Sequence, residues 1–416
     1  MEQGESGVKK IVLAYSGGLD TSVMLDWLSQ RYGCPIVAFM ADVGQGEDLD
    51  EIEQKAYRTG AQEVVIADVR ETFVRDFVFP AIQAHALYEG VYLLGTSLAR
   101  PVIARAQVEA ARRVGADCVA HGATGKGNDQ VRFELTYQAL APDLKILAPW
   151  RSWEFQGRSD LIEYAERRGI EITSTQEKPY SIDQNLMHTS YEGGILEDPW
   201  QPPPEEIFLR TANPQVAPVD PVELVIGFDK GVPVSLNQQE LDPVPLLESL
   251  NQLAGQHGLG RVDLVENWMV GMKSRGVYET PGATVLHKAH RALESITLDR
   301  EVQHFKDDLV PRISELVYYG FWFAPEMKLL IELIEKSQQL VTGEVKVELY
   351  RGNCTVKGRR APHSLYDPAY ATFEQDTVYS QADAEGFIRL QGLRLRLGAA
   401  LRAADKDRAS LAKPTG

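Results

Sequence analysis

The residues with the clearest capacity for chemistry lie in one short segment, Ala14–Ser22, with the sequence AYSGGLDTS. This segment continues an apolar run, KIVLAY, that is typical of a buried strand, and it leads into residues with helical spacing. Free backbone N–H groups and the dipole at the start of a helix favour a bound anion. Gly17 and Gly18 let the backbone approach such a ligand closely. The segment therefore predicts a phosphate-binding loop.

Polar side chains of the same loop strengthen this prediction. Ser16, Thr21 and Ser22 add hydroxyl donors, and Asp20 adds a carboxylate that could help to hold a Mg²⁺ ion beside phosphates. The loop lacks the lysine of a Walker A motif and the spacing of the GxGxxG dinucleotide fingerprint. The alternative, a turn that only connects a strand to a helix, is disfavoured by the complete SGGLDTS run after a strand.

A second Gly-rich segment, HGATGKGNDQVRFEL at His121–Leu135, follows another short apolar run, DCVA. Its glycines again allow a close approach between backbone and ligand. Lys126 is not followed by Ser or Thr, so this run is not a Walker A motif either. Arg132 offers a planar fork for a carboxylate. The other side chains suited to an amino acid are Thr124, Asn128 and Asp129.

The elements that must position these two loops alternate along the first part of the chain. Apolar runs predict strands at 10–15, 36–40, 63–68, 117–120 and 146–148, and helical spacing predicts helices at 21–31, 48–59, 72–86, 101–114 and 159–168. In the helix at 101–114, Pro101 would occupy the first turn. Such alternation predicts an α/β fold with a parallel, doubly wound sheet, in which ligands lie beyond the carboxyl ends of the strands.

The sequence pattern changes in the remainder of the chain and predicts a second, α+β domain. Residues 198–221 are rich in proline and favour an extended connection, hairpins are expected at 224–236 and 346–357, and helices at 245–257 and over most of 289–339. We expect three parts: a nucleotide-binding domain at 1–170, a domain for substrate binding and multimerisation at 171–376, and a C-terminal helical arm at 377–416. The arm packs either on another subunit or on its own domain.

Composition narrows the class of protein. The 416 residues include 43 Lys and Arg against 59 Asp and Glu, a net charge of -16, which argues against a nucleic-acid or anionic-membrane surface. The N-terminal residues show no signal or transit pattern, and no stretch is apolar enough to span a membrane. The sparse cysteines, Cys34, Cys118 and Cys354, favour reduced thiols, so we expect a cytoplasmic protein.

SGGLDTS resembles the pyrophosphate loop of the ATP pyrophosphatase family, whose members attack the α-phosphate of ATP. Longer runs resemble the argininosuccinate synthase family over nearly the whole chain. These runs are ALYEG and YLLGTSLARP within Ala86–Pro101, HGATGKGNDQVRFEL at His121–Leu135, NLMHTSYEGGILE at Asn185–Glu197, GRVDLVEN at Gly260–Asn267, GMKSRGVYETP at Gly271–Pro281, and SLY at Ser364–Tyr366.

The resemblance implies a fold like that of adenine nucleotide α-hydrolases and an ATP-dependent carbon–nitrogen ligase. Citrulline and aspartate would be joined through a citrullyl-adenylate, with release of AMP and pyrophosphate, in arginine biosynthesis. It also implies Mg²⁺ as cofactor and a homotetramer. The alternatives are another adenylating ligase with the same loop and a non-catalytic nucleotide-binding protein of the same fold. A glutamine-dependent amidotransferase and a transfer-RNA thiolase are disfavoured, because the chain shows no glutaminase setting for a cysteine and is acidic.

Individual residues take roles by the same resemblance. The implied ATP-binding residues are Ala14, Tyr15, Ser16, Gly17, Gly18, Leu19, Asp20, Thr21, Ser22, Ala41 and Gly122. Those implied for aspartate are Thr124, Asn128 and Asp129, and those implied for citrulline are Tyr92, Ser97, Asn128, Arg132, Ser181, Ser190, Glu266 and Tyr278. Asp20 and Asp129 are the expected catalytic residues, and Asp129 would orient the aspartate ammonium or accept its proton. Because several of these residues fall in the second domain, we expect the site to form between domains.

Overall fold

The computed structural model describes residues 7–171, 180–372 and 378–411. The chain divides into two compact units, residues 1–363 and 364–416. The boundary expected between residues 376 and 377 lies outside the described residues. None of the described helices is both long enough and apolar enough to cross a membrane.

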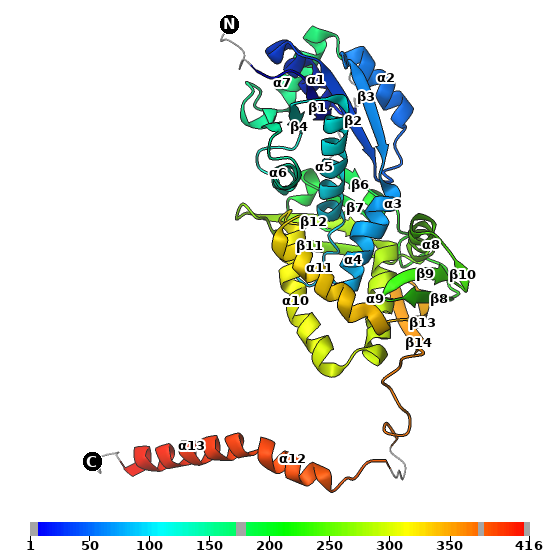
Figure 1. The fold of residues 1–416 in the computed structure, drawn as a ribbon, viewed down its shortest axis with the longest axis vertical. Helices are drawn as coiled ribbons and strands as arrows, with labels where there is room; N and C mark the ends of the chain where they lie inside the picture. Colours follow the sequence, from blue (N-terminus) through cyan, green and yellow to red (C-terminus); the bar gives the residue numbers. More distant parts are fainter. Residues whose placement is uncertain (1–6, 172–179, 373–377, 412–416) are drawn as a thin grey trace. The chain divides into compact units, whose positions relative to one another are not determined.

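The first part of the chain forms the expected parallel sheet. Its five strands are β1 (Ile11–Ala14), β2 (Ile36–Asp42), β3 (Glu63–Asp68), β4 (Cys118–Ala120) and β5 (Lys145–Leu147), in the order β3-β2-β1-β4-β5. Each adjacent pair is parallel. The helices that follow these strands are α1 (Leu19–Tyr32), α2 (Leu49–Thr59), α5 (Gly95–Val114), α6 (Asn128–Leu140) and α7 (Arg158–Arg168). The prediction of an α/β, doubly wound fold is confirmed (Figure 1).

The strand order reverses direction between β1 and β4. The chain moves outward from β1 to β2 and β3, and then returns to the other side of β1 with β4 and β5. Loops that leave neighbouring strands at such a switch point diverge and leave a crevice between them. Here the two loops are the Gly-rich segments that follow β1 and β4, so the topology brings both beside one crevice.

Helices in this part depart from the sequence-based boundaries most clearly in two places. The helix predicted at 101–114 begins at Gly95, so Pro101 lies inside α5 and not in its first turn. The first residues of α5 are buried, and their packing offsets the backbone hydrogen bond that Pro101 cannot donate. The helix predicted at 72–86 is divided into α3 (Arg70–Phe73), a π-helical turn (Val74–Val78) and α4 (Phe79–Gln83).

Helix α6 was not predicted, because the Gly-rich segment before it was interpreted as a turn over its whole length. Its buried hydrophobic residues are only Phe133 and Tyr137. This leaves little helical periodicity in the sequence. As a result Asn128, Asp129 and Arg132 stand on the first turns of a helix, in a fixed geometry, and not on a loop.

A four-stranded antiparallel sheet provides the opposite side of the crevice. Its strands are β6 (Ser181–Gln184), β7 (Thr189–Glu192), β11 (Arg261–Asn267) and β12 (Lys273–Glu279), in the order β11-β12-β7-β6. Figure 1 shows α5 extending from the parallel sheet toward β6 and β7. These strands were not predicted, because β6 and β7 are short and largely polar, and charged residues interrupt the apolar positions of β11 and β12.

A third sheet and four helices complete the first unit. The sheet has the order β10-β9-β8-β13-β14, from β8 (Val222–Asp229), β9 (Val232–Leu236), β10 (Gln239–Glu240), β13 (Gly343–Tyr350) and β14 (Asn353–Arg360), and it confirms both predicted hairpins. The helices are α8 (Pro243–Gln256), α9 (Pro281–Thr297), α10 (Arg300–Tyr318) and α11 (Pro325–Ser337). Short 3₁₀ turns lie at Pro149–Arg151, Gly194–Leu196, Glu205–Ile207 and Gln338–Leu340.

The second unit contains two consecutive helices, α12 (Asp383–Gln391) and α13 (Leu393–Leu411), separated at Gly392. The predicted helical tail is therefore confirmed. Several of its large apolar side chains are exposed in the single chain, and those of Phe387, Leu390 and Leu401 are each more than 60% exposed. Such a surface is unusual for a helix that has no partner.

Candidate active site

The loop after β1 adopts a conformation that suits a phosphate. Gly17 has φ +73°, and a Cβ at this position would lie 2.8 Å from Cγ2 of Ile52. The ammonium of Lys55 donates to the carbonyl oxygen of Gly17 over 2.7 Å and holds the loop in place. At the start of α1, Gly18 supplies no side-chain cap. The first N–H groups of α1 therefore have no capping side chain and can meet an anion.

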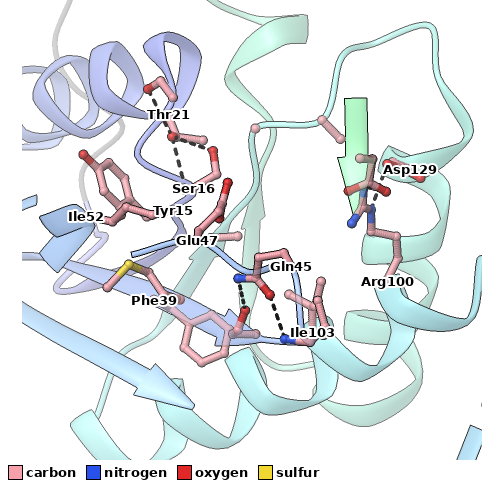
Figure 2. Close-up of a pocket in the computed structure, with 18 of the residues that line it drawn as sticks. Tyr15, Ser16, Thr21, Phe39, Gln45, Glu47, Ile52, Arg100, Ile103 and Asp129 are labelled. Atoms are coloured by element: carbon pink, nitrogen blue, oxygen red, sulfur yellow. Dashed lines mark hydrogen bonds and ion pairs between the residues drawn. The ribbon is translucent and has the colours of Figure 1, made fainter. Parts of the chain in front are cut away.

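A cavity of about 610 Å³ opens in front of this loop. Its wall comes from the residues after β1, β2 and β4 and from α5 and β6. The residues expected to bind ATP that line it are Ala14, Tyr15, Ser16, Gly18, Thr21, Ala41 and Gly122. Figure 2 shows Ser16 and Thr21 on one side, Arg100 and Asp129 on the other, and Gln45 and Glu47 between them.

The loop after β2 forms the floor of this first cavity and is held by its own side chains. Gln45 donates to the carbonyl oxygen of Ala41 over 3.0 Å and accepts from the N–H of Val43 over 2.9 Å. Glu47 also lines the cavity; burial raises its pKa, Gln45 opposes that shift, and the charge of Asp183 adds to it. No residue of this loop was singled out from the sequence; the nearest predicted residue, Ala41, lies near the end of β2.

Four residues of the predicted ATP loop do not line the first cavity: Gly17, Leu19, Asp20 and Ser22. Ser22 is fully buried, and its hydroxyl lies 3.1 Å from that of Tyr15, which it helps to orient. Asp20 stands in the first turn of α1. Burial raises the pKa of Asp20, and the positive charge of Arg158 opposes this shift.

A second, smaller cavity of about 330 Å³ adjoins the first. The two share the wall residues Arg100, Gly122, Ala123, Asp129, Ile182 and Asp183. The residues expected to bind citrulline or aspartate that line the second cavity are Tyr92, Thr124, Asn128, Asp129, Arg132, Ser181, Ser190, Glu266 and Tyr278. Ser97 does not line either cavity; it is fully buried in α5, and its hydroxyl has no hydrogen-bond partner among the described residues.

The four-stranded sheet explains why residues from distant parts of the sequence meet in the second cavity. Ser190 on β7 lies opposite Tyr278 on β12 and opposite Asp183 on β6. Directly opposed residues on neighbouring strands share a face of the sheet. The same face carries Glu192, because residues two apart on a strand point to the same side.

An ion-paired group forms the wall shared by the two cavities. Arg100 donates from Nε to Oδ2 of Asp129 over 2.8 Å and from Nη2 to Asp183 over 2.9 Å. Arg132 donates from Nη1 to the other oxygen of Asp129, also over 2.8 Å. Burial alone would raise the pKa of Asp129, but the two guanidinium groups keep it below its usual value. Asp129 is therefore ionised, with both oxygens engaged.

Aromatic rings enclose the far side of the second cavity. Tyr92 and Tyr278 stack with centroids 4.3 Å apart, and the hydroxyl of Tyr278 donates to Glu266. The hydroxyl of Tyr318 accepts from Nδ2 of Asn128 over 3.0 Å. Burial raises the pKa of Glu266, while the hydroxyl of Tyr278 opposes that rise.

Several residues of the second cavity were not singled out from the sequence. They are Thr96, Arg100, Asp183, Glu192, Trp268 and Tyr318. Arg100 and Glu192 lie inside the runs SLARP and TSYEGG that carry the family resemblance, and the two-residue spacing of Ser190 and Glu192 could have indicated a shared strand face. Tyr318 carried no such signal, because it lies at the end of a long helix far along the chain.

Glu192 differs from the other carboxylates of the second cavity. Among the described residues, none forms a hydrogen bond or ion pair with its side chain. Burial raises its pKa to about 7, and the negative charges of Glu266, Asp129 and Asp183 add to this shift. A carboxyl group with a pKa near neutrality can exchange a proton with a bound ligand.

Together the cavities suit a nucleotide beside amino acids. The first joins a phosphate loop to hydroxyl and carboxylate oxygens, which are the ligands preferred by Mg²⁺. The second holds four carboxylates (Asp129, Asp183, Glu192 and Glu266) and two guanidinium groups (Arg100 and Arg132). This excess of negative charge favours ligands with ammonium groups.

Family models match both parts of the chain. The model described as the arginosuccinate synthase N-terminal HUP domain matches residues 10–171, and the model of the arginosuccinate synthase C-terminal domain matches residues 180–398. Together they span the parallel sheet, both cavities and most of the second unit.

Curated relatives are similar over nearly their entire length. The chain is 59% identical to the argininosuccinate synthase of Desulfatibacillum aliphaticivorans over 94% of this chain and 98% of the relative. It is 58% identical to that of Syntrophus aciditrophicus over 95% of this chain and 99% of the relative. It is 57% identical to that of Rhodospirillum rubrum over 96% and 98%, respectively.

Proposed function

We propose that this chain, which belongs to the argininosuccinate synthase family, joins citrulline to aspartate at the expense of ATP and releases argininosuccinate, AMP and pyrophosphate. In the cell this reaction would serve arginine biosynthesis. The proposal is supported chiefly by the wall that the two cavities have in common. The phosphate-loop cavity and the amino-acid cavity meet at Arg100, Asp129 and Asp183, so an α-phosphate and a ureido oxygen can meet there.

ATP would occupy the first cavity, with its β- and γ-phosphates on the loop after β1. The adenosine would extend over Ala41 toward Phe39, beside the loop held by Gln45. The oxygen atoms near the phosphates are suitable ligands for a Mg²⁺ ion; they belong to Ser16, Glu47 and Asp183. When bound, Mg²⁺ would neutralise negative charge on the phosphates and on the departing pyrophosphate.

Citrulline and aspartate would share the second cavity. We propose that Tyr92, Ser181, Ser190, Glu266 and Tyr278 hold citrulline, as the family resemblance implies. Thr124, Asn128 and Asp129 would hold aspartate, and Arg132 and Asn128 would contact citrulline as well. The lining of the cavity by all of these side chains supports the assignment. Ser97, which lines neither cavity, would support the fold of α5.

The chemistry would proceed in two displacements. The ureido oxygen of citrulline attacks the α-phosphorus, the bond to the bridging oxygen breaks, and pyrophosphate leaves. The amine of aspartate then attacks the ureido carbon, and AMP leaves with the former ureido oxygen. Positioning and charge stabilisation account for most of the acceleration in such phosphoryl chemistry.

The aspartate amine reacts only after its ammonium form has lost a proton. Asp129 is a poor acceptor, because both of its oxygens are engaged by Arg100 and Arg132 and its pKa is lowered. We therefore assign Asp129 to orientation of the ammonium and Glu192 to acceptance of the proton. Glu192 faces the same cavity and has a pKa of about 7.

Asp20 remains a proposed residue for adenylation, in a positioning role. Since it lines neither cavity, it would act through the loop and the first turn of α1. Asp20→Asn should reduce adenylate formation strongly while citrulline binding stays near normal. Equilibrium dialysis with citrulline and pyrophosphate exchange into ATP would measure the two steps separately. Unchanged exchange would remove Asp20 from the mechanism.

The organisation of the whole protein follows the family in this proposal. We propose a nucleotide-binding domain at 1–170, a substrate and multimerisation domain at 171–376, and an arm at 377–416, in a cytoplasmic homotetramer. The exposed apolar side chains of α12 and α13 support an arm that takes part in assembly. Light scattering of the purified chain, with and without residues 377–416, tests the oligomeric state.

The decisive test of activity is release of AMP from ATP and Mg²⁺ with citrulline and aspartate supplied together and each omitted in turn. Sustained release of AMP and pyrophosphate only with both amino acids is expected. Release that does not depend on citrulline would indicate a different adenylating ligase. Folded protein that binds ATP without cleaving it would indicate a non-catalytic nucleotide-binding protein.

A further inference from the structure

A third cavity, with a volume of about 720 Å³, lies apart from the two substrate cavities and shares no lining residue with them. It is bounded by the segment after α4, the end of β11 and residues of α9 and α10 (Figure 1). Tyr88 lines it and stacks on Tyr318 of the second cavity, with ring centroids 3.7 Å apart. A pair of stacked rings thus lies between the two cavities.

A hydrogen-bond network next to the third cavity fixes the tautomer of His85, which is only 5% exposed. Its Nε2 lies 2.7 Å from Oε2 of Glu294, and Lys306 donates to the other oxygen of that carboxylate over 2.7 Å. Burial opposes the charge of Glu294, but His290, His85 and Lys306 keep its pKa well below its usual value. An ionised Glu294 can only accept, so Nε2 of His85 carries the hydrogen.

The other nitrogen of His85, Nδ1, therefore carries no hydrogen and can only accept a hydrogen bond. Burial lowers the pKa of His85 well below its usual value, so the ring is neutral and Nδ1 carries a lone pair. Among the described residues, no group bonds to this Nδ1, although it is buried. A buried acceptor without a partner is unfavourable, and a bound donor would remove this cost.

His287 presents a second bare acceptor beside the first. The rings of His85 and His287 are perpendicular, with centroids 5.0 Å apart, and both residues line the third cavity. Burial lowers the pKa of His287 to about 4, and a hydrogen bond to the backbone of His85 opposes that shift. Since this bond uses one nitrogen as donor, the buried Nε2, which has no partner among the described residues, is an acceptor.

The charges around the third cavity also favour a hydrogen-bond donor that carries a positive charge. Its lining includes three carboxylates, Glu89, Asp307 and Glu315, against one guanidinium, Arg291. Arg291 already donates to both oxygens of Asp307, over 2.5 and 2.6 Å. The face of an aromatic ring such as Tyr319 adds a further attraction for a cation.

The backbone of the same wall is held in an unusual conformation. His85 has φ +54° and Glu89 has φ +51°, in the left-handed region that non-glycine residues seldom adopt. Such backbone strain is unfavourable and concentrates at ligand sites and switch regions. Here it fixes the two side chains on the cavity wall.

We propose that the third cavity binds a small organic cation, a guanidinium or ammonium group carried on a short apolar chain. The cationic head would donate to the bare nitrogens of His85 and His287 and lie near Asp307 and Glu89. The apolar chain would pack against Val310 and Pro311 of α10. This site does not depend on the proposed ligase activity.

Calorimetric titration of the full chain with butylguanidinium tests this inference. Saturating citrulline and aspartate, without ATP, would keep the substrate cavities occupied. Butylurea has nearly the same shape and retains N–H donors but has no charge. We expect butylguanidinium to bind at least tenfold more tightly than butylurea. No binding, or equal binding of the two, would overturn the proposal.

Two variants and one control locate the binding. Val310→Trp fills the cavity, and His287→Leu removes one acceptor; each should weaken butylguanidinium binding at least tenfold. Val302→Trp adds the same ring to an exposed position of the same helix, α10, and should leave binding unchanged. Full binding by both cavity variants would place the cation elsewhere. A change in sedimentation of Val310→Trp alone would make this cavity a contact between subunits and would also overturn the proposal.

Discussion

At the scale of single residues, the environment of a carboxylate decides its chemical role. Asp129 and Glu192 line the same cavity, but Asp129 lies between two guanidinium groups and Glu192 lies among other carboxylates. The first environment stabilises the charged form, and the second stabilises the protonated form. Carboxyl side chains therefore supply both a fixed negative charge and a group that can exchange a proton near neutral pH.

Glu192→Gln should lower kcat by about a hundredfold, the usual contribution of a general base. Because the pKa of Glu192 is about 7, activity of the unmodified chain should fall as the pH is lowered through 7, where the carboxylate becomes protonated. The variant should lose this dependence. The measurement is kcat and KM for each substrate between pH 5.5 and 9, at intervals of about half a unit.

The exposed Glu206→Gln provides a matched control and should retain both the rate and the pH profile. A variant at Glu192 with normal kcat and a raised KM for one amino acid would show that this carboxylate binds an ammonium group and does not accept the proton.

At the scale of elements, the site depends on the switch point between β1 and β4. The two Gly-rich loops lie far apart in the sequence but leave adjacent parallel strands, so the sheet brings them to one crevice. α5 carries Arg100 to the same place, and α6 carries Asp129 and Arg132. Helices α5 and α6 therefore fix the charged group between the cavities.

Gly17→Ala should impair the phosphate loop specifically. The added Cβ would lie 2.8 Å from Ile52 and would also be strained at φ +73°. Strain of this kind costs about 1–3 kcal/mol, so KM for ATP should rise by about tenfold or more. KM for citrulline should change little. Steady-state kinetics with each substrate varied in turn would measure both constants.

Gly33→Ala is the control for strain without a clash. Gly33 ends α1 at φ +61°, and a Cβ there would meet nothing within 4 Å. This variant should lose about 1 kcal/mol of stability and keep its KM for ATP. Equal kinetic effects of the two substitutions would mean that the loop conformation is not what binds the phosphates.

At the scale of the whole molecule, a buried polar network joins elements that are distant in the sequence. Glu294 of α9 is fully buried and accepts from Lys306 of α10 and from Gln338 after α11, each over 2.7 Å. It also contacts His85 after α4. A buried charge group of this kind holds its neighbours in one arrangement, provided that all its members are paired.

Lys306→Met should destabilise the fold by about 3–5 kcal/mol, because it leaves the buried charge of Glu294 without its ammonium partner. Lys336→Met, at an exposed position of α11, should have little effect. Urea unfolding followed by circular dichroism would compare the two free energies of unfolding. A small effect at Lys306 would mean that water or a protonated imidazole can replace its charge.

The same network predicts acid sensitivity. Burial lowers the pKa of His287 and His290 to about 4, whereas an unfolded chain would titrate near 6.5. Between these values the unfolded chain binds more protons, so stability is complete above pH 6.5 and is lost as the pH falls toward 4. The lowered pKa of Glu294 acts in the same direction at still lower pH. Thermal unfolding measured from pH 4 to 8 would reveal this trend. Constant stability below pH 6.5 would contradict the buried, neutral state of these imidazoles.

The parallel sheet could be predicted from the sequence alone, together with the position of the proposed phosphate loop. The strands of this sheet are short apolar runs, and Asp48 and Gly60 mark the ends of α2 in the sequence as they do in the structure. Strand burial and helix capping are local preferences, so they are visible in neighbouring residues. The residues around the loops were identified for the same reason, together with the long runs that resemble the family.

Which of these residues face a cavity, and which charges meet, could be seen only in the folded chain. The sheet of β6, β7, β11 and β12 has few buried apolar positions, so its strands left little periodic signal. The roles of Arg100, Asp183 and Glu192 arise from contacts or charge effects between residues distant in the sequence, and Pro101 remains helical because its helix is buried. Burial and long-range charge are properties of the folded chain, and they fix the pKa of each group and the shape of each cavity.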